Sequence, residues 1–406
     1  MSYSTAAIEF GTSKIVVLIG NGKSHGNFEV IGSGVCAYMG YHKRQWIDLN
    51  DLYKATVTAI RSAEIDAKVK IREIYVGVPG EFTEIEYYHN SVEIMSKDKK
   101  INEIDVESIL DSISTSFQSH ENKILHQYPI SYVIDGKHET EEPIGLQGNS
   151  LQAEIAAIVS DNEFTSKIES ILSNIGINVK RFISATLGQG LLYMSTEDRE
   201  KTSILLDVGY QSTEISVFIR DGLVSKQTVP LGGANITSDI AIVLQLSMEQ
   251  AEQLKRRYVF GLDIDSVSQG DAFDMVIKEG QQSRRISFFD VQKIIESRVE
   301  EIALIVKALL VKAGLDSTMQ PIVYLSGGGI ALLQGGKDFI AKCMDLPVKL
   351  LVSNKIGFDN AVMNSALGIL EFALEDPSNQ EKNKIKIIVL YIKKITYWFI
   401  SKIKGV

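Results

Sequence analysis

The sequence has few of the residues that mark secreted, metal-binding or membrane-spanning proteins. Its two cysteines, Cys36 and Cys343, lie far apart without the spacing of a zinc site, which argues against a disulfide or zinc framework and favours a reducing compartment. The six histidines show no metal-ligand spacing either. The amino terminus lacks a basic start before an apolar core, so no secretory signal is expected. No uninterrupted apolar run is long enough to cross a bilayer.

Acidic residues outnumber basic ones, with 51 Asp and Glu against 42 Lys and Arg. The net charge of -9 argues against bulk binding of nucleic acid. A length of 406 residues allows two or more domains, and a composition of 45% hydrophobic and 23% charged residues is that of a soluble globular protein. We therefore expect a globular chain of several domains.

The most informative stretch is residues 204–218, where an apolar run ends in Asp207 and a second run follows a short turn. An acid at the end of a buried strand is costly unless something pairs with it. Glycine and hydroxyl residues in the turn offer backbone N–H groups suited to an anion. The stretch predicts a strand–turn–strand hairpin that holds a phosphate and a metal ion, although an ordinary hairpin with an aspartate in its turn would look the same. The turn residues concerned are Gly209, Gln211, Ser212 and Thr213.

The same pattern opens the chain at residues 6–19. Glu9 corresponds to Asp207 and Gly11 to Gly209, and small polar residues follow the glycine in both copies. Two phosphate-type hairpins about half a chain apart predict a duplicated α/β fold with two facing lobes. A nucleotide would then lie in the cleft, with one hairpin contributed by each lobe.

Periodicity predicts the elements around the hairpins. The expected strands are residues 28–35, 73–78, 83–92, 125–134, 151–159, 178–184 and 322–325. The expected helices are residues 48–69, 161–175, 185–195, 247–258 and 290–313, with others starting near Asp105 and near Asn235 or Thr237. Because strands dominate from residue 81 to about 160, we expect a small inserted α+β subdomain there.

Two glycine-rich turns follow the second hairpin. Gly232 and Gly233 precede a predicted helix, and the triplet of residues 327–329 follows a predicted strand. Such turns let a helix N-terminus or a flat ligand approach the backbone closely. The helix at residues 247–258 places Glu252 and Lys255 on one face. Behind two matched hairpins, these turns favour a nucleotide site.

The chain ends in a basic segment. A polar linker, residues 374–384, precedes it, and residues 382–404 contain seven lysines and no acids, which leaves a charge of -16 on residues 1–381. Residues 385–404 have an apolar helical face with lysines opposite, and the two central lysines disfavour spanning. This pattern predicts an amphipathic helix lying in an anionic membrane surface; the alternative is a helix packed on the body. The expected membrane residues are Ile388, Ile392, Lys393, Lys394, Ile395, Trp398 and Phe399.

The order of these features resembles the actin and heat-shock-chaperone ATPase superfamily, and within it the FtsA family of bacterial cell-division proteins. The most specific blocks are residues 230–241 (Pro-Leu-Gly-Gly-Ala-Asn-Ile-Thr-Ser-Asp-Ile-Ala) and 251–258 (Ala-Glu-Gln-Leu-Lys-Arg-Arg-Tyr). Residues 125–133 and 142–146 are similar to that family's inserted subdomain. The terminal amphipathic helix after a linker is a further similarity, so the resemblance covers essentially the whole chain.

The resemblance implies an actin-like two-lobe fold of four subdomains. They would be 1A (residues 1–80, 161–195 and 357–373), 1C (81–160), 2A (196–228 and 306–356) and 2B (229–305). Such proteins bind ATP and Mg²⁺ between the lobes and form actin-like filaments. They tether filaments of the tubulin-like FtsZ to the cytoplasmic face of the plasma membrane at the septum, alongside other division proteins.

The resemblance also assigns roles to individual residues. Glu9 and Asp207 would hold Mg²⁺ through waters. The implied phosphate ligands are Gly11, Thr12, Ser13 and Lys14 from one lobe and Gly209, Gln211, Ser212 and Thr213 from the other. The implied nucleotide residues beyond these are Gly232, Gly233, Glu252, Lys255, Gly327, Gly328 and Gly329. Candidates for gripping an acidic, apolar tail peptide of FtsZ are Arg284, Arg285 and Arg298, which otherwise read as solvated basic surface.

Several positions depart from the superfamily pattern. Glu9 stands where Asp is usual, Tyr210 and Gln211 where small residues are common, and Glu214 where Asp often follows. We therefore expect ATP binding with slow or absent hydrolysis. Two other functions stay open: a metabolic kinase, which the insert and the lysine-rich helix argue against, and an FtsZ-independent scaffold related to pilus-assembly or shape-determining proteins.

Overall fold

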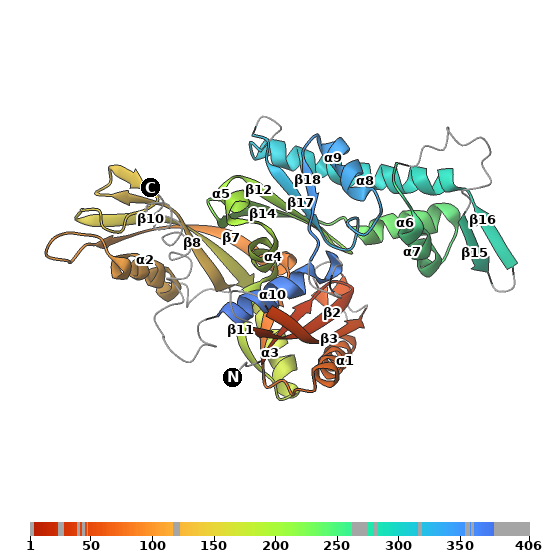
Figure 1. The fold of residues 1–406 in the computed structure, drawn as a ribbon, viewed down its shortest axis with the longest axis horizontal. Coiled ribbons are helices and arrows are strands. Elements are labelled where there is room, and N and C mark those ends of the chain that lie inside the picture. The colour runs from red at the N-terminus through yellow and green to blue at the C-terminus, as the bar shows by residue number, and fades with distance from the viewer. Residues whose placement is uncertain are drawn as a thin grey trace.

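The computed structural model describes residues 4–22, 28–38, 41–42, 45–46, 48–116, 122–261, 275–279, 282–315, 319–353, 358 and 361–376. Within them, two five-stranded sheets form the centres of two lobes, and a four-stranded sheet forms an insert beside them (Figure 1). The predicted linker beyond residue 376 and the amphipathic helix of residues 385–404 lie outside the described residues. None of the described helices is long and apolar enough to span a membrane.

The two lobe sheets match strand for strand. Their orders are β3–β2–β1–β6–β11 and β14–β13–β12–β17–β18. In both, the first three strands pair antiparallel and the last three pair parallel, which confirms the predicted duplication. The first sheet is β1 Ser4–Phe10, β2 Lys14–Gly22, β3 Phe28–Ala37, β6 Glu73–Val78 and β11 Asn178–Ser184. The second is β12 Ser203–Val208, β13 Thr213–Ile219, β14 Gly222–Val229, β17 Ile322–Ser326 and β18 Val348–Leu350.

Helices cover both faces of the first sheet, so its central strands are apolar throughout rather than alternating. One face packs against α1 (Leu49–Ala67) and α3 (Asn162–Asn174). The other packs against α10 (Asn364–Glu375), which follows the last strand of the second sheet. Leu370 of α10 lies so close that a Cβ on Gly20 would come within 2.8 Å of it.

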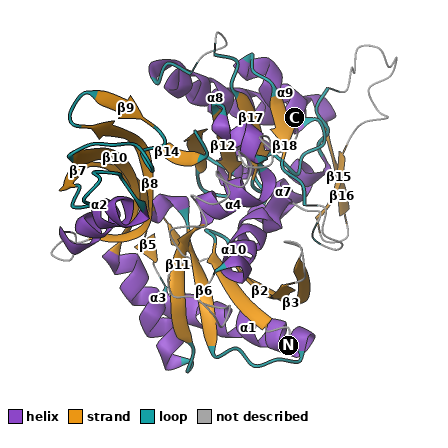
Figure 2. Cartoon of the chain, turned by 60° about the vertical axis from the view of Figure 1, so that its left-hand side comes forward, coloured by secondary structure: helices purple, strands orange, loops and turns teal. Residues whose placement is uncertain are grey.

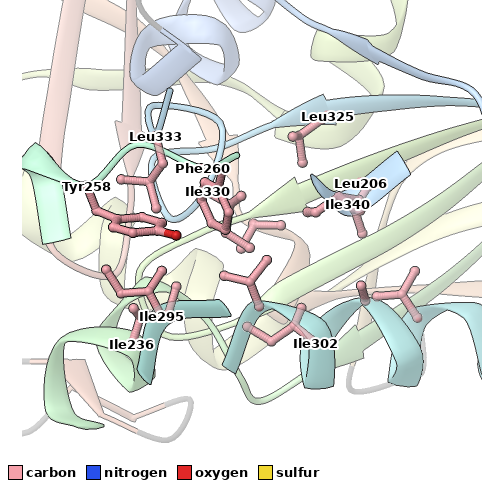
Figure 3. Packing of buried hydrophobic residues seen from close by; sticks show 14 of the residues in the cluster. Leu206, Ile236, Tyr258, Phe260, Ile295, Ile302, Leu325, Ile330, Leu333 and Ile340 are labelled. Carbon is pink, nitrogen blue, oxygen red and sulfur yellow. The ribbon is translucent and has the colours of Figure 1, made fainter. Parts of the chain in front are cut away.

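The second sheet is covered in the same way. On one face lies α4 (Ala185–Tyr193), which follows the last strand of the first sheet, and Gly190 contacts the Phe218 ring. On the other face a large cluster joins the sheet to the remaining helices; Figure 3 shows Leu206 and Leu325 of the sheet with Ile302. These helices are α6 Gly233–Leu244, α7 Met248–Arg257, α8 Phe288–Lys312 and α9 Gly336–Met344. The short α5 (Thr196–Glu200) lies outside this cluster, and its Arg199 guanidinium donates to the Gly190 carbonyl of α4 at 3.3 Å. The helix that follows the first sheet, α4, therefore packs on the second sheet, and the helix that follows the second sheet, α10, packs on the first.

The insert has its own sheet and core, as predicted. Its strands, in the order β7–β10–β8–β9, carry α2 on one face and form a sheet separate from the two lobe sheets (Figure 2). The insert touches the second sheet at β14, where Lys226 Nζ donates to the Thr83 carbonyl at 2.7 Å. Its elements are β7 Thr83–Glu93, α2 Glu103–Ser116, β8 Asn122–Ile134, β9 His138–Thr140 and β10 Ser150–Asp161. The smaller described elements of the chain are β4 Tyr41–His42, β5 Gln45–Trp46, β15 Met275–Glu279 and β16 Gln282–Ile286, with 3-10 turns at Gly80–Phe82 and Ala361–Met363.

Three predicted helix starts were wrong by about two residues. One is α8, which was expected from residue 290 and begins at Phe288. The insert helix begins at Glu103 rather than near Asp105, because the Asn102 side chain accepts the Ile104 backbone N–H at 2.8 Å. The helix expected near Asn235 or Thr237 begins at Gly233, because Asn235 Oδ1 accepts the Gly232 N–H at 2.9 Å and so lies inside the first turn. The glycine pair thus forms the start of α6 itself.

Candidate functional site

The two predicted hairpin turns are built alike. In the first, the Gly11 N–H donates to the Lys14 carbonyl at 2.9 Å; in the second, the Gly209 N–H donates to the Ser212 carbonyl at 2.9 Å. Each turn follows a central strand that carries its acid, Glu9 in β1 and Asp207 in β12. The duplicated sheets therefore place two equivalent acid-and-turn units, one in each lobe.

The two acids and Lys14 lie close enough for their charges to interact across the lobes. Burial raises the pKa of Glu9 to about 7, opposed by the Lys14 charge and by hydrogen bonds from the Ser365 side chain and the Ala366 backbone, while the Asp207 charge raises it further. Burial likewise raises the pKa of Asp207 to about 6, opposed mainly by a hydrogen bond from Gln189. With these pKa values, both carboxyl groups change protonation state near neutral pH.

Lys14 completes this group. Burial lowers the pKa of its ammonium, and the Glu9 and Asp207 charges raise it. Its Nζ also donates to the Val362 carbonyl at 3.3 Å. Carboxylate oxygens suit a hard cation such as Mg²⁺, and an ammonium suits phosphate. The described residues contain no cluster of three or more metal-ligating side chains. A cation held by Glu9 and Asp207 would therefore take its other ligands from phosphate and water.

Three glycine turns of the second lobe pack on one another beside Asp207. The Gly233 N–H donates to the Gly209 carbonyl at 2.9 Å, and the Gly329 N–H donates to the Val208 carbonyl at 2.8 Å. A Cβ on Gly329 would lie 2.6 Å from the Gly209 oxygen, and one on Gly232 would lie 2.7 Å from it. Only glycine allows so close an approach, so the predicted turns form one surface.

The side chains predicted beside the adenosine lie next to this surface and pair with each other. Lys255 Nζ and Glu252 Oε2 are 2.6 Å apart. The ammonium also donates to the Gly233 carbonyl at 3.1 Å and to the Thr237 hydroxyl at 2.9 Å. The pair therefore links α7 to the first turn of α6, where Gly233 begins the helix.

The hydroxyl residues of the turns differ in their surroundings. Thr12 and Ser13 are half-buried in the first turn. Ser212 donates to the Glu81 carboxylate of the other lobe. Thr213 is fully buried and its hydroxyl donates to the Leu231 carbonyl at 2.7 Å, so it holds the glycine turn rather than facing the acids.

The structure adds Gln189, Thr186 and Ser216, which the sequence did not single out. Gln189 Nε2 donates to Asp207 Oδ2 at 2.7 Å, and Glu214 accepts hydrogen bonds from Thr186 and Ser216. The available signal for Gln189 was its place between Gly188 and Gly190, since two glycines inside a helix indicate close packing. Nothing in the local pattern indicated that its partner would be Asp207.

The three arginines predicted to bind a peptide do not lie together. Arg298 lies in an open groove of about 630 Å³ between α6 and α8, and both Oδ atoms of Asp239 accept from its guanidinium, at 2.6 and 3.1 Å. Arg284 and Arg285 are exposed on β16. The groove is lined by Asp239, Val243, Leu244, Asp290, Lys293, Ile294, Ser297, Arg298 and Glu301.

Replacing Glu9 by a neutral residue tests how much its buried negative charge destabilises the folded protein. An acid whose pKa is raised in the folded state destabilises that state as pH rises from about 4.5 to about 7. We expect Glu9→Gln to raise the free energy of unfolding of the ligand-free protein by roughly 3 kcal/mol at pH 8 and to change it little at pH 4.5. Urea denaturation at both pH values measures this, with Glu84→Gln, an exposed site on β7, as control. Equal stability of variant and wild type at pH 8 would contradict the inferred burial of Glu9.

Comparison with known families gives two matches. Residues 204–368 match the model of "Cell division protein FtsA", and residues 82–159 match the "SHS2 domain inserted in FTSA". The second match coincides with the insert of β7 to β10. Together the matches include the second hairpin, both later glycine turns and the whole insert.

Curated relatives are similar over most of the chain. The cell division protein FtsA of Pseudomonas aeruginosa is 25% identical over 92% of this chain and 89% of its own. That of Bacillus subtilis is 27% identical over 90% and 82%, and that of Escherichia coli is 24% identical over 96% of both. The similarity therefore extends over most of this chain and most of each relative.

Solved structures share the fold at low sequence identity. A chain of the PilM–PilN type IV pilus biogenesis complex superposes with a TM-score of 0.63 at 13% identity, covering 91% of this chain and 98% of that one. MreB5 of Spiroplasma citri bound to ADP superposes with a TM-score of 0.55 at 11% identity, covering 94% and 99%. These neighbours establish an actin-like fold for the chain.

Proposed function

Since this chain belongs to the FtsA family of cell division proteins, we propose that it binds ATP and Mg²⁺ between its lobes, assembles into actin-like filaments and anchors FtsZ filaments to the membrane. The observation that carries the proposal is the meeting of Glu9, Lys14 and Asp207 from two equivalent hairpins. Anchoring would take place at the cytoplasmic face of the plasma membrane at the septum, with other division proteins as further partners.

In the proposed nucleotide site each lobe supplies one carboxylate and one turn. Bound Mg²⁺ would neutralise phosphate charge, with Glu9 and Asp207 orienting its waters. Lys14 would pair with phosphate oxygens, and the N–H groups of the two turns would donate to them. The surface of Gly232, Gly233 and residues 327–329, beside the Lys255–Glu252 pair, would support the adenosine.

Slow or absent hydrolysis is part of the proposal. Glu214 is the acid next to the second turn, and it already accepts from Thr186 and Ser216, with Lys226 Nζ 3.9 Å away. A carboxylate held by three partners is poorly placed to take a proton from water. A steady-state assay showing rapid, sustained phosphate release would contradict this part while leaving nucleotide binding intact.

The groove between α6 and α8 is the proposed site for the FtsZ tail. It combines the apolar Val243, Leu244 and Ile294 with the cations Lys293 and Arg298, which suit the apolar and acidic groups of such a peptide. The groove is also lined by Asp239, Asp290 and Glu301, so only these two cations would attract the peptide. Arg298 is held by Asp239, so a peptide carboxylate would share or replace that partner. Arg284 and Arg285 on the β15–β16 hairpin would contact a longer peptide outside the groove.

We retain the four proposed subdomains with the boundaries given above. The insert, 1C, would replace the second subdomain of actin, and the match at residues 82–159 supports its limits. An FtsZ-independent membrane scaffold is the second candidate function, favoured by the fold similarity to the PilM–PilN complex.

Co-sedimentation with anionic liposomes tests the proposal. With ATP and Mg²⁺, the full chain is expected to carry an FtsZ tail peptide into the pellet. Arg298→Glu should weaken peptide recruitment about tenfold, near 1.4 kcal/mol, because it places a negative charge in the groove. The matched control is Arg61→Glu, on the exposed face of α1. A chain that binds the membrane but ignores the peptide would support the scaffold function instead.

A further inference from the structure

A line of buried hydrogen bonds ends at the Asp207 carboxylate. Asn364 Nδ2 donates to Ser326 Oγ at 3.1 Å, and Ser326 Oγ donates to Gln189 Oε1 at 2.7 Å. Gln189 Nε2 then donates to Asp207 Oδ2 at 2.7 Å. All the donors point the same way, so each bond polarises the next toward the carboxylate.

The members of this line are shielded from water. Gln189 is 3% exposed, and Ser326 and Asn364 are fully buried. A buried amide is costly unless it is hydrogen-bonded, and Gln189 uses both ends of its amide. Asn364 Nδ2 makes a second bond, to the Leu351 carbonyl at 2.9 Å. The Gln189 amide is therefore held in one orientation.

The line also joins parts of both lobes. Asp207 and Ser326 are paired residues of the neighbouring strands β12 and β17 in the second sheet. Gln189 lies on α4, and Asn364 lies on α10, which packs on the first sheet. The two helices cross where Gly188 meets Gly368, and a Cβ on Gly188 would lie 2.9 Å from the Gly368 carbonyl carbon. This close crossing sets the position of Gln189 relative to Asn364.

We propose that Gln189 is a positioning residue that fixes the Asp207 carboxylate for the water shell of nucleotide-bound Mg²⁺, with Ser326 and Asn364 holding its amide. The inference rests on the proposed binding of ATP and Mg²⁺ and adds a residue for which no other role has been argued. Outer partners of a metal-binding carboxylate restrict its rotation, and their loss typically weakens metal binding by about tenfold to a hundredfold.

The test separates positioning from general support of the fold. Gln189→Met keeps the length of the side chain and removes its donor and acceptor. We expect the Mg²⁺ concentration that half-saturates ATP binding to rise about tenfold, while ATP affinity in EDTA stays within about twofold. Gln152→Met, at an exposed position of β10 in the insert, should change neither value. A role confined to folding would weaken both affinities alike.

Two results would overturn the inference: equal weakening with and without Mg²⁺, or no change in either. Failure of the wild-type chain to bind ATP would overturn the proposed function as well, so the two failures are distinguishable. Ser326→Ala is the second variant, for use if Gln189→Met does not fold. This variant removes the hydroxyl that donates to the Gln189 amide oxygen, and it should raise the half-saturating Mg²⁺ concentration without changing ATP affinity in EDTA. A folded Ser326→Ala protein that shows no such rise would contradict the proposed role of Gln189.

Discussion

Removal of residues 382–406 is expected to leave a folded, nucleotide-binding body that no longer sediments with anionic liposomes. The segment carries seven lysines, and each basic residue near an anionic surface contributes about 1 kcal/mol. Its apolar face adds insertion into the interface. Because residues 1–381 carry a charge of -16, the truncated chain should be repelled by the same lipid. Co-sedimentation at about 0.1 M and about 0.5 M salt, between which the Debye length falls roughly twofold, separates the charge attraction from the apolar insertion.

Point substitutions in the full-length chain test the membrane contact without removing the terminal segment. Replacing Trp398 and Phe399 by glutamate should abolish sedimentation, since it removes apolar anchors and adds negative charge. The control is the same pair of changes at Leu49 and Tyr53, which are exposed on α1. Continued sedimentation of the truncated chain would show that the membrane contact lies in another part of the protein.

Asp207→Asn is expected to weaken binding of ATP with Mg²⁺ by about a hundredfold, near 2.7 kcal/mol. The change removes the second lobe's carboxylate and preserves its shape. Because the pKa of Asp207 is raised to about 6 and that of Glu9 to about 7, wild-type affinity should fall as pH decreases from 8 to 6, when protons compete with Mg²⁺. In the variant this pH dependence should be weaker.

Calorimetric titrations at pH 8 and pH 6 measure the effect of Asp207→Asn. The matched control is Asp345→Asn, at the exposed C-cap of α9, where the left-handed conformation suits asparagine. Affinity of the Asp207 variant within threefold of wild type would show that this carboxylate does not serve the ion. The proposed roles of Glu9 and Gln189 would then need another explanation.

Much of the fold could be predicted because its signals are local. The two acid-and-turn hairpins appear in the sequence as apolar runs with an acid and a glycine, and both have the predicted antiparallel pairing. The insert was visible as a change from mixed to strand-rich pattern. Two of the errors were also local: side-chain hydrogen bonds of Asn102, before α2, and of Asn235, in the first turn of α6, fix where these helices begin, and periodicity does not report such bonds.

By itself, the sequence determined the duplicated α/β fold, the two acids and the basic terminal segment, since each depends on neighbouring residues and on strand or helix periodicity. Tertiary structure alone decided which side chains from different elements meet. It paired Gln189 with Asp207, engaged Thr213 with Leu231 and placed Arg298 against Asp239. Those contacts follow from the crossing of α4 with α10, from the pairing of β13 with β14 and from the packing of α6 on α8. Contacts between different elements leave no periodic pattern in the sequence.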